Sequence, residues 1–140
     1  MRSREQCLKI AFVAGAITDA AALVPMLYPP MAKLLWGFDD TGGPYLFAMG
    51  YGASLMAAWT VLLVWAWQRP VERAFVAALT VFVIYGLVAT EIFAVLSGVL
   101  PAWRMIPTWI LQAGLLALFV RGYHHSWFAR DTGQVLPGGA

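Results

Sequence analysis

Charged residues are scarce in this sequence. They make up 11% of its 140 residues, whereas 61% are hydrophobic. A soluble domain carries about 25% charged residues, so a soluble fold of this chain would have too little polar surface to face water. The composition therefore places the chain in a lipid bilayer.

Cysteine and clustered basic residues are also scarce. Cys7 is the single cysteine, which excludes an internal disulfide and a cysteine-rich metal site. The sequence has 9 Lys and Arg residues and 7 Asp and Glu residues, and its basic residues form no block. Nucleic-acid binding is therefore not expected. Motifs for nucleotide binding, zinc proteolysis, thiol-disulfide exchange and serine hydrolysis are missing. We predict neither a metal site nor a cofactor.

Long apolar runs account for most of the chain. An α-helix needs about 20 residues to cross about 30 Å of hydrocarbon, and runs of this length cover residues 8–28, 45–67, 71–100 and 105–123. Short connections favour antiparallel neighbours. The sequence predicts an all-α polytopic membrane protein, an up-down bundle of four transmembrane helices.

The domain organisation follows from these runs. We predict one transmembrane domain over residues 1–129 and a flexible cytoplasmic tail over 130–140, because the tail has few apolar anchors. In the first connection, residues 31–36 are compatible with either a short amphipathic helical turn in the interface or an ordered loop.

Basic residues are distributed unequally between the two sides of the predicted bundle. Such residues are retained on the cytoplasmic side of a membrane. Lys33 and Arg104 lie on one side, and seven lie on the other: Arg2, Arg4, Lys9, Arg69, Arg73, Arg121 and Arg130. We expect an inner (plasma) membrane protein of bacterial type with both termini in the cytoplasm.

Each predicted helix carries a polar residue at a similar depth. Asp19, Ser54, Glu91 and Gln112 lie about 10–13 Å from the outer boundary, and Tyr51 lies about 9 Å from it. Polar groups in lipid need partners within the protein. We therefore expect these side chains to form one buried layer facing the bundle axis.

The two acids are the candidate catalytic residues. An Asp at the centre of a membrane helix costs roughly 2.5–3.5 kcal/mol, so Asp19 and Glu91 call for an explanation. Two carboxyls that share a site can exchange one proton between them, as acid/base chemistry or proton coupling requires. The alternative is a structural network in which the acids, Gln112 and Tyr51 pair with one another and fix the helix register.

The residues around this layer favour a lipophilic small molecule as its ligand. It would contact Tyr51, Ser54 and Gln112 and lie against a set of aromatic side chains: Phe12, Phe47, Trp59, Phe93 and Trp109. The acids could then catalyse a double-bond isomerisation, a cyclisation or an epoxide opening. The layout is similar, in architecture alone, to the small membrane isomerases and sterol-binding proteins of the emopamil-binding type, which also set acids inside a helix bundle.

Two other functional classes remain open. A proton-coupled transporter is one, because the small multidrug-resistance exporters are similar in outline, with four helices and an acid in the first. This chain departs from them in its second acid and its strong basic asymmetry. The other class is an accessory subunit of a membrane complex or a homo-oligomer, in which small residues such as Gly50 support close helix contacts.

Overall fold

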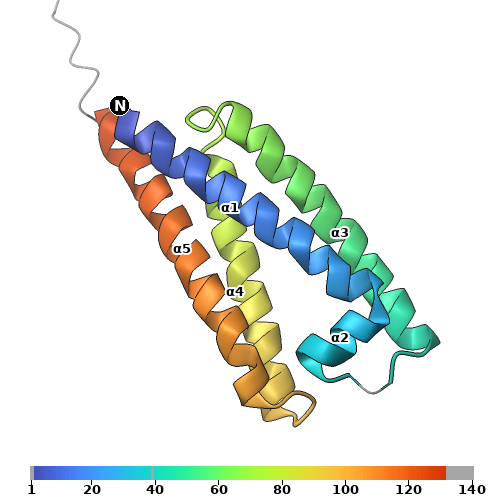
Figure 1. The fold of residues 1–140 in the computed structure, drawn as a ribbon. Helices are drawn as coiled ribbons and strands as arrows, with labels where there is room; N and C mark the ends of the chain where they lie inside the picture. Colours follow the sequence, from blue (N-terminus) through green and yellow to red (C-terminus); the bar gives the residue numbers. More distant parts are fainter. Residues whose placement is uncertain (1, 39, 132–140) are drawn as a thin grey trace, which may run out of the picture.

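The chain folds into five helices. The structure, a computed structural model, describes the backbone of residues 2–38 and 40–131 and the side chains of residues 5–38 and 40–123. The helices are α1 (Arg2–Leu27), α2 (Pro29–Trp36), α3 (Gly43–Gln68), α4 (Phe75–Leu96) and α5 (Ala102–Asp131), and the described residues contain no strand (Figure 1). The predicted all-α class is confirmed. Most of the predicted tail, residues 132–140, lies outside the described residues.

Four of the helices are long and apolar enough to cross a bilayer. These spans are Glu5–Leu27, Gly43–Gln68, Phe75–Leu96 and Ala102–Tyr123. The chain is thus a multi-pass membrane protein with the architecture of an up-down four-helix bundle. α4 is shorter than the predicted run 71–100 at both ends. Residues 71–74 form a turn before it, and Gly98 adopts a left-handed conformation with φ of 71° just after it.

The helices do not pack equally against one another. α1 packs most extensively against α3 and also against α5, α5 packs against α4, and α3 scarcely touches α4. α1 and α5 lie together at the N-terminal end and diverge toward the other end, where α2 lies (Figure 1). The bundle is consequently tighter at one end than at the other.

The hydrophobic core occupies the tight end. Leu8 and Phe12 of α1, Leu63 of α3, Val76 of α4 and Phe119 of α5 are fully buried there. The rings of Phe12 and Phe119 lie 5.9 Å apart between centroids. A Cβ at Gly15 would lie 2.9 Å from Cζ of Phe119, so the missing side chain is what allows α1 and α5 to approach so closely.

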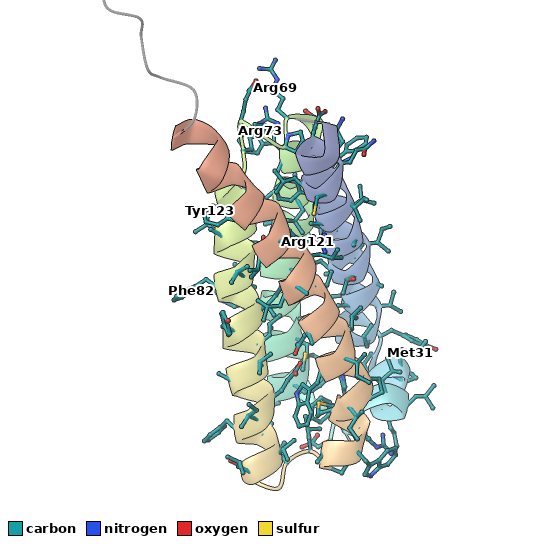
Figure 2. The ribbon with its side chains drawn as sticks, turned by 90° about the vertical axis from the view of Figure 1, so that its left-hand side faces the viewer. Met31, Arg69, Arg73, Phe82, Arg121 and Tyr123 are labelled. Atoms are coloured by element: carbon teal, nitrogen blue, oxygen red, sulfur yellow. The ribbon has the colours of Figure 1, made fainter. Side chains whose placement is uncertain are left out.

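The connection between α3 and α4 closes the same end. Arg73 lies over the ring of Trp65 with its guanidinium carbon 3.6 Å from the centroid, and it donates a hydrogen bond to the Trp65 carbonyl. Arg69 and Arg73, together with Arg121 and Tyr123, lie in one half of the bundle, and Met31 of α2 lies in the opposite half (Figure 2).

α2 occupies the wide end. Of the two alternatives for residues 31–36, the helix is observed: Pro29 and Pro30 begin it, and Gly37, with φ of 79°, ends it. Nη1 of Arg104 donates to the carbonyl oxygens of Lys33 and Leu34 at 3.3 Å each. These two hydrogen bonds connect the C-terminal end of α2 to the start of α5.

Candidate functional site

One polar contact joins two membrane-spanning helices in the described part of the chain. Nε2 of Gln112, on α5, donates to Oε1 of Glu91, on α4, at 2.8 Å. Gln112 is buried, with 7% of its surface exposed, and Glu91 is half-buried. The hydroxyls of Thr18, Thr60, Thr80 and Thr90 instead donate to carbonyl oxygens four residues earlier in their own helices.

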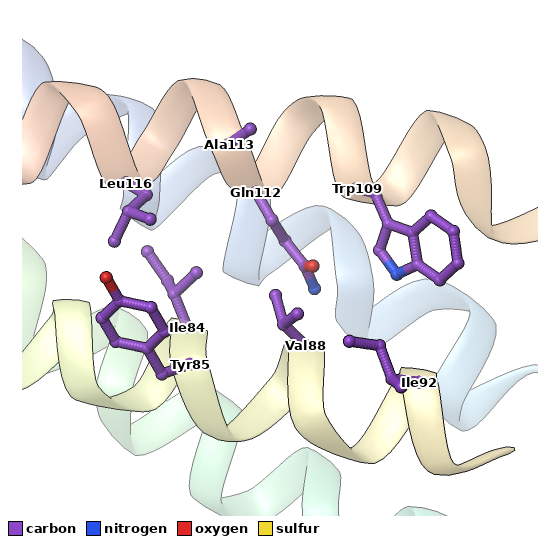
Figure 3. Close-up of a pocket in the computed structure, with 8 residues that line it drawn as sticks. All are labelled: Ile84, Tyr85, Val88, Ile92, Trp109, Gln112, Ala113 and Leu116. Atoms are coloured by element: carbon purple, nitrogen blue, oxygen red, sulfur yellow. The ribbon is translucent and has the colours of Figure 1, made fainter. Parts of the chain in front are cut away.

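A groove lies beside this pair. Its volume is about 310 Å³, and its walls come from α4 and α5: Ile84, Tyr85, Val88, Ile92, Trp109, Gln112, Ala113 and Leu116 (Figure 3). Ile84 and Gln112 are buried, whereas Tyr85, Ile92 and Ala113 are exposed. The groove is therefore a side opening at the α4–α5 junction, with buried residues beneath exposed ones.

Three buried polar atoms in and behind this groove have no hydrogen-bond partner. They are Oε2 of Glu91, Oε1 of Gln112 and Nε1 of Trp109. The indole N–H of Trp109 lies near the Glu91 carboxyl without reaching hydrogen-bond geometry. Buried polar atoms in proteins are almost always paired, so three unpaired atoms in one place are a feature of the site that needs an explanation.

Asp19 is not part of this pair. It lies on the face of α1 that carries Phe12 and Ala16, but it is half-buried and makes no hydrogen bond or ion pair within the described residues. The structure does not support the prediction that both acids are buried, since Asp19 and Glu91 are each half-buried. No hydrogen bond links Asp19 to Glu91 in the part of the chain that the structure describes.

α3 does not contribute Tyr51 and Ser54 to an inward layer. Tyr51 is 66% exposed, and the Ser54 hydroxyl, also exposed, donates to the Tyr51 carbonyl of its own helix at 2.7 Å. The buried residues of α3 are instead Ala53, Leu63 and Ala66. The predicted facing is wrong because both sides of a membrane helix are apolar, so composition does not mark the packed side.

The predicted aromatic contacts separate into two groups. Phe12 is fully buried in the core, Trp59 is half-buried beside it, and Trp109 lines the groove. Phe47 and Phe93 are 78% and 70% exposed and lie outside the groove lining. Of the predicted site residues, the structure therefore gathers Glu91, Gln112 and Trp109.

Sequence reasoning missed most of the groove wall. Ile84, Val88 and Ile92 recur every four residues, which places them along one side of α4. That signal was present, but it does not show which helix lies opposite. No group of His, Cys, Asp and Glu that could hold a metal ion occurs among the described residues.

Comparison with known proteins gives no guide to this site. No protein-family model matches the chain, and no curated protein or solved structure matches it. Only the geometry of the chain itself bears on its function.

Proposed function

We propose that this protein binds a lipophilic small molecule in the groove between α4 and α5. The observation that carries the proposal is an apolar groove of about 310 Å³ next to three unpaired buried polar atoms. Ligand pockets have volumes of about 300–1,000 Å³, mostly apolar walls and a few polar groups that orient the ligand. The groove has such a volume and such apolar walls, and the unpaired polar atoms of Gln112 and Trp109 lie beneath its surface.

The side opening favours entry from the bilayer. Tyr85, Ile92 and Ala113 edge the groove on the exposed surface of helices that span the membrane. An apolar ligand dissolved in lipid would reach it without crossing water. A purely structural role for the Glu91–Gln112 pair fits less well, because a structural network gains most when every member is paired.

Catalysis is not part of this proposal. Acid/base chemistry with two carboxyls needs both within reach of one substrate, and Asp19 is not among the residues that line this groove. We propose further that the protein lies in the plasma membrane with both termini in the cytoplasm, since seven of its 9 basic residues fall on that side.

Filling the groove tests the proposal. Ala113→Phe would place a ring in the groove, and Ala117→Phe places the same ring one turn along α5, at an exposed position outside the groove. Native mass spectrometry of the purified wild type and of Ala117→Phe is expected to show a bound lipophile. Ala113→Phe is expected to lose it while keeping the wild-type helical circular dichroism.

Two results would contradict the proposal. One is a wild-type protein that carries no lipophile after mild extraction and in lipid nanodiscs. The other is an adduct that persists unchanged in Ala113→Phe, which would place the bound molecule elsewhere on the surface.

A further inference from the structure

The unpaired atoms beside the groove differ in what they need from a ligand. Gln112 Nε2 is already used by Glu91, so Gln112 Oε1 is left as an acceptor that needs a donor. Nε1 of Trp109 carries a hydrogen and needs an acceptor. The two residues are three positions apart on α5 and share a face, and both line the groove.

We propose that the ligand is a lipophilic alcohol, whose hydroxyl donates to Gln112 Oε1 and accepts from the Trp109 indole N–H. This inference rests on the proposed function, because it names the class of molecule that the groove takes. A hydroxyl is the smallest group that both donates and accepts. Its apolar tail would lie along Ile84, Val88 and Leu116.

Other polar groups satisfy the two unpaired atoms of the groove-lining residues, Gln112 Oε1 and Trp109 Nε1, less completely. An ether or a ketone only accepts, so Gln112 Oε1 would stay unpaired. An ammonium group only donates, so the Trp109 indole N–H would stay unpaired. A carboxylate only accepts, so Gln112 Oε1 would again stay unpaired.

Glu91 acts in this arrangement as a positioning residue. Its Oε1 accepts from Nε2 of Gln112, and this bond turns the amide so that Oε1 of Gln112 remains for another donor. Both atoms that would meet the hydroxyl are covered by neighbouring side chains. Val88 and Ile92 lie opposite Gln112 and Trp109 (Figure 3). The side chains that cover the two atoms would change rotamer to admit the hydroxyl, and such rotamer changes are common on binding.

The size of the groove sets the length of a suitable probe. A water molecule, close in size to a methylene group, takes about 30 Å³, so a groove of about 310 Å³ holds roughly ten methylene groups. We would use a 12-carbon primary alcohol with a diazirine at mid-chain. The matched probes are its methyl ether and the corresponding carboxylic acid.

The experiment is photolabelling of the full chain in nanodiscs, followed by peptide mapping. The alcohol is expected to label the α4 and α5 segments that line the groove about tenfold more than the ether does, since an unpaired buried polar group disfavours binding by about that factor. Trp109→Phe should lower labelling by the alcohol and by the ether, because the oxygens of both probes accept from the indole N–H. Trp103→Phe, the same substitution at an exposed position on α5, should leave labelling by both probes unchanged.

The outcomes separate this inference from the proposed function. Equal groove labelling by all three probes, blocked by Ala113→Phe, would overturn the alcohol preference and leave lipophile binding in place. A preference for the ether or the acid would also overturn it. No groove labelling above that of the exposed helix faces, by any probe, would overturn both proposals.

Discussion

Gln112 is the most informative polar residue in the described part of the chain. Thr80 is the other buried one, and its hydroxyl is satisfied by the Val76 carbonyl of the same helix at 2.8 Å. An amide brings two donors and one acceptor and here finds its partner, Glu91, on another helix. Gln112 therefore marks where α4 and α5 meet, and its remaining acceptor marks where a ligand would bind.

Substitution of a single glycine can test how closely α1 packs against α5. A Cβ at Gly15 would meet Cζ of Phe119 at 2.9 Å and Cδ1 of Leu63 at 3.1 Å, and both of these side chains are fully buried. We expect Gly15→Ala to destabilise the fold by about 1–2 kcal/mol, because overpacking outweighs the gain in helix propensity. Thermal unfolding in detergent, compared at one scan rate, should show a midpoint several degrees lower.

Gly86→Ala is the matched control for this prediction. It is also a helical position, but nothing lies within 4 Å of a Cβ built there. Its unfolding midpoint should be unchanged or slightly higher, because alanine favours a helix over glycine by up to about 1 kcal/mol. Equal effects of the two substitutions would contradict the close approach of α1 and α5 at Gly15.

At the scale of elements, α2 shows how a short helix is held in place without burying much of itself. Ala32 is its one buried residue, and Leu34 is 73% exposed. The Lys33 carbonyl accepts from the N–H of Gly37, which ends the helix, and Arg104 donates to the carbonyl oxygens of Lys33 and Leu34 from the start of α5. The rings of Trp36, Phe38 and Tyr45 then pack edge to face, with centroids 5.9 and 5.7 Å apart, and lead the chain into α3.

Arg104→Ala should loosen α2 while the rest of the bundle stays folded. The lost hydrogen bonds are exposed and should be worth about 1 kcal/mol, because water competes for them. That corresponds to roughly a fivefold rise in local opening. Hydrogen exchange of the amides of residues 31–36 should quicken by this factor.

Arg69→Ala is the control for the capping contact. Arg69 is exposed and pairs with Glu72 near the opposite end of the bundle, so its removal should leave exchange in α2 unchanged. An α2 that exchanges at the wild-type rate in Arg104→Ala would show that the aromatic contacts alone hold it.

At the scale of the whole molecule, the bundle is asymmetric from end to end. The buried core cluster lies at the end with the N-terminus and the α3–α4 connection, whereas α2 and the Glu91–Gln112 pair lie toward the other end. The basic side chains labelled in Figure 2 lie in the tightly packed half. We therefore expect that half to face the cytoplasm and the site to lie in the outer half of the bilayer.

Reporter fusions expressed in a bacterial host test this orientation. Green fluorescent protein at the C-terminus should fluoresce, and alkaline phosphatase fused after Gly98 should be active, since that connection is expected outside. Alkaline phosphatase fused after Arg69 should be inactive. The reverse pattern would show that the excess of basic residues does not set the topology of this chain.

The sequence by itself determined the architecture, because a chain that crosses hydrocarbon needs long apolar helices with breaks between them. The apolar runs and the breaks can both be recognised from the composition and spacing of the residues. It also picked out Glu91, Gln112 and Trp109, because polar groups are conspicuous in apolar helices. The tertiary structure decided how the helices face one another. Tyr51 and Ser54 are exposed, and the sequence did not show this, because lipid and protein interior are equally apolar and only helix packing distinguishes one side of a membrane helix from the other. The groove belongs to the tertiary structure for the same reason, since its walls are ordinary apolar residues until α4 lies against α5.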